Sequence, residues 1–440
     1  MTASDSPLPA HVRRELRSFL ECGILAHGFA RVRCKDCADS VLVAFRCKGR
    51  AFCPSCGARR MASTAAHLVD HVLPRVPFRH VVLSLPFPVR LLLARSDRLL
   101  GLVLATFLGE LDRWLAERTA TTGEVGDSGA VTIVQRFGSA LNLNVHFHTL
   151  LMAGRFVVRP GPRGGIEFVG DEKAIETEDL LALETRIGRA IVRRLESEGA
   201  IEEGAIAFED PEDSVLGVCE AASVSGRIAF GPSRGARTER EGAIVSEQEG
   251  SHGRRSHGFD LFLGKPVTDR GQLERLCRYL ARPPVPARRL SWREDGRLRL
   301  ELPRAWSDGT QALVFDPLDF ISRLAAIVPR PRVNQIRYHG ILAPNAAWRS
   351  RVVPTDGRVV RRRRHGVPTR GRWLRWAELM KRVFEQDVLR CDSCGGRREV
   401  IALIQERSVI EAILDSLELP SVPPQVKPSW WERGQALIFG

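Results

Sequence analysis

The sequence predicts an α+β protein: an antiparallel sheet core with packed helices, preceded by a small zinc ribbon and followed by a basic C-terminal extension. Strand-like and helical segments are interspersed, six of the ten cysteines lie between Cys22 and Cys56, and residues 349–382 hold twelve Lys and Arg against two acids. A chain of 440 residues has room for two to four domains of roughly 100–200 residues each. We therefore expect a zinc-binding domain at residues 1–75, a core at 76–330 with an insertion at about 156–260, and an extension at 331–440.

The charge of the chain narrows the class of partner. Lys and Arg number 66 and Asp and Glu 52, so the formal net charge is +14, which favours nucleic acid or another anionic surface. No apolar run reaches the ~18 residues of a membrane-spanning helix, and Met1–Glu15 lacks the pattern of a signal peptide. We therefore expect a soluble, cytoplasmic protein without a membrane partner.

The periodicity of apolar residues predicts the elements of the chain in order. Helices are expected where apolar residues recur every three or four positions, at residues 8–22, 60–73, 97–117, 269–281 and 317–328. Strands are expected at residues 79–86, 130–137, 141–152, near 286–303 and at 311–316. The stretch 156–260 is Gly-rich and in part acidic, and we expect much of it to be an insertion or flexible excursion outside the core.

The cysteine pairs in the first domain have the spacing of a zinc site. Cys34 and Cys37 are followed, after fifteen residues, by Cys53 and Cys56, and four thiolates at this spacing suit a closed tetrahedral structural zinc site. Cys22 and Cys47 are left over. Cys47 could replace one of the four ligands, or both could be buried free thiols.

Basic residues surround these cysteine pairs, among them Arg59 and Arg60. A small ribbon with such a rim could hold the phosphates of duplex or hairpin DNA. The alternative is a purely structural ribbon whose charges are solvated.

The strand at 141–152 places two histidines on one face. Because successive strand side chains point to opposite faces, Leu141, Leu143, Val145 and Phe147 share one face, and Asn142, Asn144, His146 and His148 share the other. Two imidazoles one pleat apart can grip a single divalent ion. The alternative is a half-exposed strand with solvated histidines. Gln135, on the neighbouring strand, is a candidate third ligand or an ordinary hydrogen-bonding residue of the strand.

The helix at 269–281 carries one of the two tyrosines of the chain. Asp269 and Gln272 form a plausible cap, and Leu273, Leu276, Cys277 and Leu280 form the buried stripe. Tyr279 lies at the edge of this stripe, where its phenol could reach a surface site and act as a nucleophile. The alternative is a boundary tyrosine with a packed ring and an exposed hydroxyl.

The C-terminal extension combines cations with aromatic residues. Its basic run includes Arg361, Arg362, Arg363 and Arg364, with Trp373 and Trp376 nearby, a composition that suits a single-stranded DNA backbone and stacked bases. Cys391 and Cys394 form half a metal site, whose other ligands would come from elsewhere in the chain or from a second chain.

Several longer motifs resemble one family. The His–hydrophobe–His motif at 146–148 with a tyrosine on a downstream helix is similar to the HUH class of single-strand endonucleases. Five segments look like the rolling-circle transposases of the insertion sequence ninety-one family: FCPSCGARR at 52–60, QRFGSALNLNVHFH at 135–148, RYLARPP at 278–284, RYHGILAPN at 337–345 and LRCDSCGG at 389–396.

The resemblance implies a bacterial, nucleoid-associated enzyme with an HUH-endonuclease-like core. It would nick single-stranded DNA through a 5′-phosphotyrosine bond on Tyr279, with Mg²⁺ or Mn²⁺ held by His146 and His148. Its partners would be the element's single-stranded ends, hairpins and target DNA, and a second copy of the chain. Some members carry two tyrosines four residues apart, and the first of these positions is Arg275 in this chain.

Two other functions remain open at this point. A plasmid-type replication initiator or relaxase would use the same chemistry, and the zinc ribbon together with the late cysteine pair favours the transposase over it. A non-catalytic zinc-ribbon DNA-binding regulator is the other alternative, against which the intact His146, His148 and Tyr279 speak.

Overall fold

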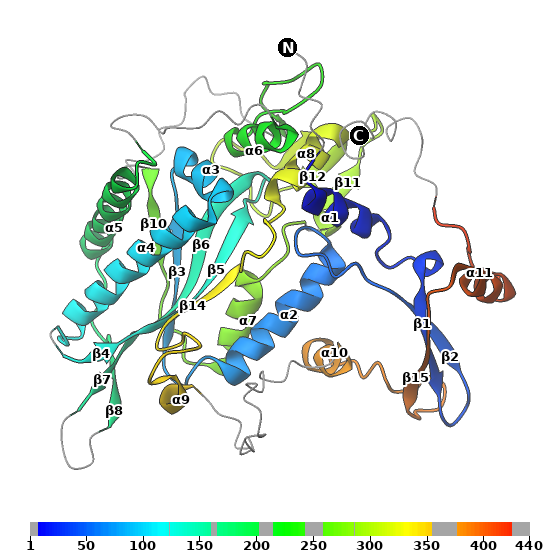
Figure 1. The fold of residues 1–440 in the computed structure, drawn as a ribbon, viewed down its shortest axis with the longest axis horizontal. Coiled ribbons are helices and arrows are strands. Elements are labelled where there is room, and N and C mark those ends of the chain that lie inside the picture. Colours follow the sequence, from blue (N-terminus) through cyan, green and yellow to red (C-terminus); the bar gives the residue numbers. More distant parts are fainter. Residues whose placement is uncertain are drawn as a thin grey trace.

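The computed structural model describes residues 8–122, 124–159, 165–201, 214–242, 258–285, 287–353 and 376–424. The fold is α+β with antiparallel sheets, as the sequence predicted. Its centre is a five-stranded antiparallel sheet (Figure 1). In spatial order its strands are β10 (Asp260–Leu263), β3 (Phe78–Ser84), β6 (Leu143–Met152), β5 (Gly129–Phe137) and β14 (Ile336–Gly340).

The middle strand, β6, separates two different environments. Leu143, Val145 and Phe147 are completely buried on one face of the sheet, whereas His146 and His148 lie on the other, as the alternation of the sequence predicted. The register with both neighbours is continuous around the histidines, since Gln135 of β5 and Ser84 of β3 both lie opposite His146. Paired residues of an antiparallel ladder share a face, so these side chains point to the same side.

Helices cover the apolar face and form the larger core (Figure 1). They are α3 (Phe87–Arg95), α4 (Asp97–Arg118), α5 (Thr177–Ser197), α6 (Val215–Ser225) and α8 (Pro317–Ile327). The hydroxyl of Ser96 accepts a hydrogen bond from the Leu99 N–H and caps α4. None of the helices in the described part of the chain is both long and apolar enough to cross a bilayer.

The prediction that much of 156–260 lies outside the core was wrong for its two helices. In α5 the residues Leu183, Ile187, Ile191 and Leu195 recur every four positions and are buried in the larger core. Reciprocal hydrogen bonds between Glu176 and Asp179 cap the start of this helix. The Gly-rich composition masked a regular amphipathic pattern. Residues 160–164, 202–213 and 243–257 of this stretch lie outside the described residues.

Two helices cover the opposite face, α2 (Pro54–His71) and α7 (Arg270–Leu280), packed against each other (Figure 1). Their buried side chains, among them Leu68 and Cys277, join Leu150 of β6 in a second core cluster. The carboxylate of Asp269 accepts a hydrogen bond from the Gln272 N–H (2.7 Å), so the predicted cap of α7 is confirmed. The α7 helix thus lies on the same face of the sheet as the histidines.

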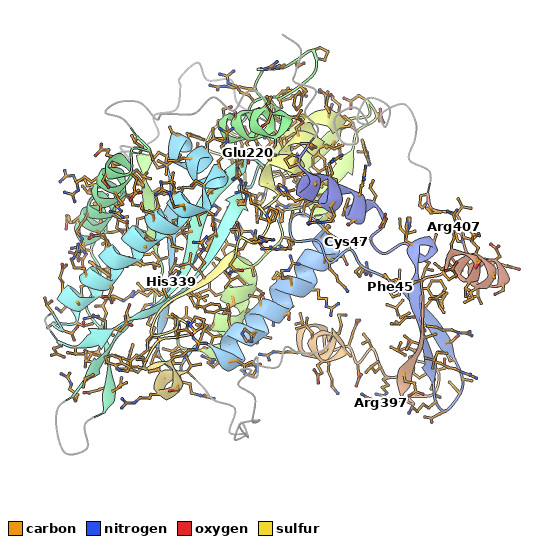
Figure 2. The ribbon with its side chains drawn as sticks, in the orientation of Figure 1. Phe45, Cys47, Glu220, His339, Arg397 and Arg407 are labelled. Atoms are coloured by element: carbon orange, nitrogen blue, oxygen red, sulfur yellow. The ribbon has the colours of Figure 1, made fainter. Side chains whose placement is uncertain are left out.

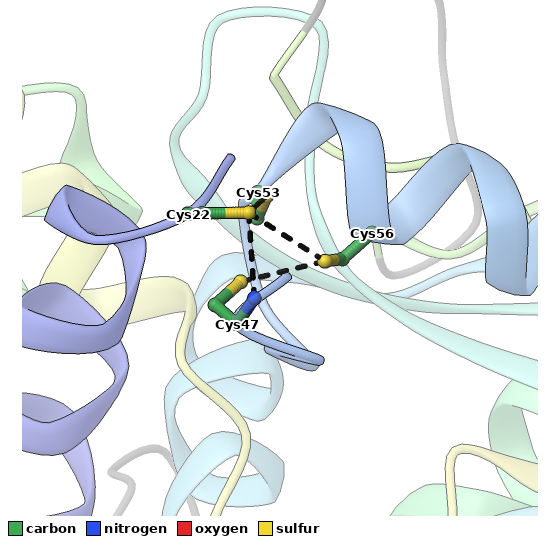
Figure 3. Close-up of side chains that lie close together, drawn as sticks. All are labelled: Cys22, Cys47, Cys53 and Cys56. Atoms are coloured by element: carbon green, nitrogen blue, oxygen red, sulfur yellow. Dashed lines mark hydrogen bonds between the residues drawn. The ribbon is translucent and has the colours of Figure 1, made fainter. Parts of the chain in front are cut away.

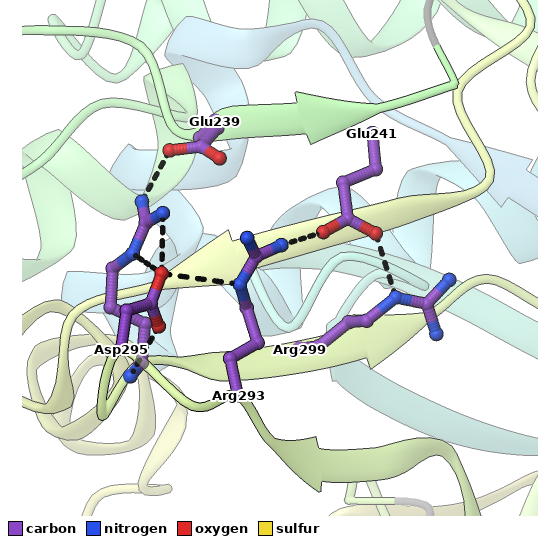
Figure 4. A network of polar contacts seen from close by, with 6 residues as sticks. Glu239, Glu241, Arg293, Asp295 and Arg299 are labelled. Carbon is purple, nitrogen blue, oxygen red and sulfur yellow. Dashed lines mark hydrogen bonds and ion pairs between the residues drawn. The ribbon is translucent and has the colours of Figure 1, made fainter.

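Two smaller sheets extend this body. One contains β4 (Gly126–Asp127), β7 (Gly154–Val158) and β8 (Ile166–Gly170). The other contains β11 (Leu290–Trp292), β12 (Leu298–Glu301), β13 (Ala312–Phe315) and β9 (Glu239–Glu241), and the short helix η3 (Ala287–Arg289) precedes it. Figure 4 shows Glu241 between Arg293 and Arg299, an ion-pair network that joins segments distant in sequence. Half-exposed pairs of this kind contribute about 0–1 kcal/mol each.

The third small sheet joins the two ends of the chain. It contains β15 (Arg398–Ile404), β1 (Phe29–Cys34) and β2 (Ser40–Ala44), and helices η1 (Leu25–His27) and α11 (Arg407–Ser416) pack against it. Figure 1 shows this module as a separate lobe beside α2 and α10 (Trp376–Phe384). Helix α9 (Arg349–Val352) lies near the sheet strand β14.

The three segments expected from the sequence are therefore interleaved in space. Helix α1 (Ala10–Leu20), from the expected zinc domain, buries Val12 and Leu16 in the larger core. Strand β14, from the expected extension, belongs to the central sheet. Strand β15, also from the expected extension, pairs with β1 from the beginning of the chain. Residue boundaries along the chain do not separate these bodies, because strand pairing between distant segments builds them.

The packing of α5 generates a testable prediction. Ile187→Ala removes a completely buried side chain and should lower the free energy of unfolding by about 2–5 kcal/mol. Leu181→Ala, on the exposed side of the same helix, should change it by no more than about 0.5 kcal/mol. Urea denaturation followed by circular dichroism measures both. Equal, small effects of the two substitutions would show that α5 does not belong to the core.

Candidate functional site

Three histidines form a connected cluster on the polar face of the central sheet. His146 and His148 project from β6, and their Nε2 atoms lie 3.1 Å apart. His148 Nδ1 lies 2.9 Å from Nε2 of His80 on the neighbouring strand β3. At the other end of the cluster, His146 Nδ1–H donates to the Asn144 carbonyl (2.8 Å). The cluster therefore runs from Asn144 across two strands to His80.

Burial keeps these imidazoles neutral. It lowers the pKa of His146 to about 4, against a smaller opposite effect of the Asn144 carbonyl, with Arg282 and Arg90 adding to the decrease. Burial, followed by the neighbouring histidines and Arg282, lowers the pKa of His148 to about 2. Burial and Arg282 lower the pKa of His80 to about 4. Neutral imidazole is the form that binds metals.

The neutral state also determines the tautomers. Because His146 donates through Nδ1, its Nε2 carries a lone pair and accepts a hydrogen bond from His148 Nε2–H. His148 Nδ1 is then an acceptor, and His80 Nε2–H donates to it. Sequence reasoning placed residues 79–86 on a strand but missed His80. The sequence carries no local signal for it, because its face depends on the pairing of Val82 with His148, from which the face of His80 follows by alternation.

Gln135 links the histidine strand to the tyrosine helix. Its Nε2 donates to the backbone carbonyl of Leu280 (2.6 Å), at the C-terminal end of α7. Its Oε1 is buried and has no hydrogen-bond partner within the described residues. A buried amide oxygen without a partner costs roughly 1–3 kcal/mol, and an ion would satisfy it. The predicted neighbourhood of Gln135 and His146 is present, because the two residues are directly paired.

Tyr279 lies beside the histidines on the exposed side of α7. Its ring centroid is 6.0 Å from that of His148 and 6.2 Å from that of His80, and 51% of the residue is exposed. The guanidinium of Arg282 lies 4.3 Å from the centre of the phenol ring, and Arg282 also donates to the Tyr279 carbonyl (3.2 Å). The structure therefore brings together an accessible phenol, neutral imidazoles and a cation.

The cysteines form two clusters, and the grouping differs from the predicted one. The structure does not bring Cys34, Cys37, Cys53 and Cys56 together into one site. Instead, the pair Cys53 and Cys56 joins the two cysteines left over in the sequence analysis. Spacing in the sequence groups the C-x₂-C segments (knuckles) that follow each other along the chain. In the structure, pairing of β1 with β15 brings the Cys34/Cys37 knuckle next to the Cys391/Cys394 knuckle near the other end of the chain.

The first cluster contains Cys22, Cys47, Cys53 and Cys56 at the N-terminal end of α2 (Figure 3). The Sγ atom of Cys22 lies 3.6 Å from that of Cys53 and 3.8 Å from that of Cys56, and Cys47 Sγ lies 3.5 Å from Cys56 Sγ. Burial raises the pKa of Cys53 to about 11, so this thiol ionises when a cation compensates the thiolate. Four convergent sulfurs of this kind fit zinc.

The second cluster contains Cys34, Cys37, Cys391 and Cys394. Cys34 Sγ lies 3.5 Å from Cys394 Sγ, and Cys37 Sγ lies 3.6 Å from Cys391 Sγ. Figure 2 shows the distance between the two clusters: Cys47 lies beside the end of α2, and Arg397, next to the second cluster in sequence, lies at the far tip of the module.

The predicted DNA-binding arginines are only partly described. Arg59 is exposed on α2, whereas Arg60 donates to the Lys48 carbonyl (3.1 Å) and its pKa is lowered by burial. The run Arg361–Arg364 and Trp373 lie outside the described residues.

The fold and the site together define a class: an α+β protein with a Cys₄ module and a histidine–tyrosine site on an antiparallel sheet. Residues 129–350 match the family model described as "Putative transposase", and residues 2–85 match the "Transposase zinc-binding domain" of insertion sequence ninety-one transposases. The chain therefore belongs to this transposase family, whose members act on DNA. No match to a curated protein or to a solved structure was found. The zinc-domain match includes all four thiols of the first cluster.

The first cluster is packed directly against the end of the tyrosine helix. Gly57 follows Cys56 on α2, and a Cβ atom at Gly57 would lie 2.5 Å from the Cβ of Pro283, three residues after Leu280. The backbones of the two segments can approach this closely only because residue 57 has no side chain. The cysteine cluster and the position of Tyr279 are thus mechanically connected.

This contact predicts opposite effects of two glycine substitutions. Gly57→Ala should lower the thermal unfolding midpoint, because Pro283 must move. Gly109→Ala, in the exposed middle of α4 with no atom within 4 Å of the new Cβ, should stabilise the protein by about 0.5–1 kcal/mol. Calorimetric scans of both variants measure this difference. A stabilising Gly57→Ala would contradict the close packing.

Proposed function

We propose that the chain nicks and rejoins single-stranded DNA during rolling-circle-type transposition, through a 5′-phosphotyrosine bond on Tyr279. The observation that carries this proposal is the position of the exposed Tyr279 ring 6.0 Å from the ring of His148, whose Nε2 converges with that of His146. Membership of the transposase family supports it. The DNA partners we propose are the element's single-stranded ends, its hairpins and the target strand.

The residues present fit a divalent metal ion, Mg²⁺ or Mn²⁺. His146 and His148 would supply their Nε2 atoms, and Gln135 would supply the buried Oε1 that has no partner. Such an ion polarises the scissile phosphate and stabilises its developing negative charge. To offer a lone pair at Nε2, His148 would carry its proton on Nδ1, and His80, with its own proton on Nδ1, would accept that hydrogen bond at Nε2. His80 is thus a positioning residue.

The covalent step conserves the number of phosphate ester bonds. The Tyr279 oxygen forms a bond to phosphorus, the bond from phosphorus to the 3′ oxygen breaks, and the proton lost by the phenol is balanced by the one gained by the 3′ hydroxyl. Arg282 supplies positive charge over the phenol ring, which attracts the phosphate to the nucleophile. Rejoining is the reverse reaction with a new 3′ hydroxyl.

A single tyrosine restricts how two transfers are completed. Arg275 occupies the position one helical turn before Tyr279, and the only other tyrosine, Tyr338, is half-buried in β14 against the second core cluster. We propose that Tyr279 acts twice, that a second protomer contributes its own Tyr279, or that the free 3′ hydroxyl performs the second transfer. A role of Tyr338 in packing agrees with its surroundings.

The cysteine module and Arg59 would contribute electrostatic contacts to phosphates, together with the Arg361–Arg364 run. A replication initiator or relaxase would use the same site, and a donor-plasmid mobility assay separates it from a transposase. A non-catalytic regulator would bind the same DNA without cutting it.

Trapping of the covalent intermediate tests the proposal. Tyr279→Phe should abolish the metal-dependent DNA adduct and leave DNA binding unchanged, because the phenyl ring keeps its packing and loses only the nucleophile. Labelled single-stranded DNA from the element's end, incubated with Mn²⁺ or with chelator, is analysed on a denaturing gel. Tyr338→Phe is the matched control and should retain the adduct. Persistent linkage in Tyr279→Phe would refute the assignment.

The low pKa values of the histidines predict metal binding that resists acid. Each imidazole stays neutral as the pH falls until its own folded-state pKa is reached, and these values are about 4 for His146 and about 2 for His148. Between about pH 7.5 and 5.5, Mn²⁺ affinity should change less than about threefold, whereas two solvated histidines of pKa 6.5 would lose about a hundredfold. Titration calorimetry measures this, with His146→Ala/His148→Ala as the control that lacks binding.

A further inference from the structure

We infer that Cys34, Cys37, Cys391 and Cys394 form a second zinc site, closed by the two ends of the chain. This site goes beyond the proposed strand transfer and does not depend on it. It also lies beyond the match to the zinc-binding domain, which ends at residue 85 and so contains only two of the four thiols.

The positions of the four sulfurs agree with tetrahedral coordination. Their Sγ atoms all lie within 4.8 Å of one another, with 3.5 Å between Cys34 and Cys394 and 3.6 Å between Cys37 and Cys391. A tetrahedron of Zn–S bonds of about 2.3 Å has sulfur–sulfur edges of about 3.8 Å. The sulfurs come in two C-x₂-C pairs, one from each knuckle, as in structural zinc sites. The cluster has the same separations as the first one, where they are 3.5 to 3.8 Å.

The backbone of each knuckle is shaped around its sulfur atoms. The residue after the second cysteine of each pair has a left-handed conformation, with φ of 63° at Ala38 and 74° at Gly395. Ala38 adopts it at a cost of roughly 1–2 kcal/mol, which the surrounding contacts must offset. The Gly396 N–H points to Cys394 Sγ (3.4 Å), a contact that stabilises a thiolate.

Contacts outside the sulfurs hold the two knuckles face to face. Arg398 pairs with Asp39 (2.8 Å), and the Lys35 N–H donates to the Arg397 carbonyl (3.1 Å). A Cβ atom at Gly396 would lie 2.0 Å from the carboxylate of Asp36, so a side chain at this position would displace that carboxylate. These contacts continue the β1–β15 ladder, in which Cys34 lies opposite Arg398. The four ligands are therefore preorganised rather than gathered by chance.

The donor set selects the ion. Four thiolates prefer Zn²⁺ over the hard cations Mg²⁺ and Ca²⁺, which take oxygen ligands. On binding, each thiol loses its proton to solvent, so four S–H bonds are exchanged for four Zn–S bonds and no oxidant is needed. The alternative fate of the same thiols is two disulfides, Cys34–Cys394 and Cys37–Cys391, which would require an oxidant and is an outcome of the test below.

The second zinc site would connect the β15-β1-β2 sheet to α7, the helix that carries Tyr279. It closes chain loops of 354 and 360 residues, and a cross-link across long loops removes much freedom from the unfolded chain. Just before it, α10 packs Leu379 against Ala62 and Ala66 of α2. Arg382 of α10 bridges the carboxylates of Asp70 on α2 and Glu274 on α7 (3.1 and 2.7 Å). Zinc would therefore fix the segment that follows α10, the helix whose Arg382 joins α2 to the tyrosine-bearing helix α7.

Zinc content of the full-length protein tests the inference. Purified wild type should contain two zinc ions per chain by mass spectrometry of the metal, and Cys391→Ser/Cys394→Ser should contain one. Ser393→Ala, an exposed non-ligand in the same knuckle, is the matched control and should keep both. The inference would be overturned if the double variant kept the zinc content of the wild type, whether that content is two ions per chain or one.

A second measurement avoids variants that fail to fold. In wild type, Cys391 and Cys394 should resist alkylation by iodoacetamide until a chelator is added, as mapped by peptide mass spectrometry, with both residues recovered as thiols. Alkylation without chelator would contradict a bound ion. Recovery of Cys34–Cys394 or Cys37–Cys391 as disulfide-linked peptides under non-reducing conditions would replace the zinc site with a redox pair.

Discussion

The alternation of side chains along β6 is the constraint on which the rest of the structure depends. This strand pairs on both edges, so its register is fixed by β3 and β5 together, and a slip of one residue would move every side chain to the opposite face. Burial of Phe147 and Val145 in the larger core sets the orientation. The same event that buries these apolar residues turns His146 and His148 toward α7. The folding free energy of the core thus positions two polar groups that the core itself does not need.

Burial of the imidazoles has two effects: it fixes their positions and it keeps them neutral. An exposed histidine would titrate near neutral pH, and protons would then compete with a metal ion for its ring nitrogen. Here the chain of hydrogen bonds from the Asn144 carbonyl to His80 leaves each ring one defined tautomer, and the cations Arg282 and Arg90 lower the pKa of His146 further. Gln135 adds the mechanical link, because the same side chain contacts the end of the tyrosine helix and faces His146.

Much of this could be predicted from the sequence, and the exceptions have a common cause. Period and capping identified β6, α4 and α7 because these signals are local. His80, the partnership of Cys34 with Cys394, and the place of β14 in the central sheet all depend on which strand lies beside which. Strand order is a property of the whole chain, so spacing within one segment cannot reveal it. The misjudged helix α5 is different: its four-residue pattern was present and was obscured by Gly-rich neighbours.

The tyrosine helix is held from several directions, and this determines what can move during a reaction. Helix α2 packs along α7, Gln135 holds its last carbonyl, Pro283 is wedged against Gly57, and Arg382 ties Glu274 to Asp70. The side chain of Tyr279 extends from this frame into solvent, and 51% of the residue is exposed. A phenol on a fixed backbone can reach a new phosphate by rotation about its own side-chain bonds alone. In the strand transfer proposed above, the DNA strand would therefore bend to the protein, which suits a flexible single strand better than a stiff duplex.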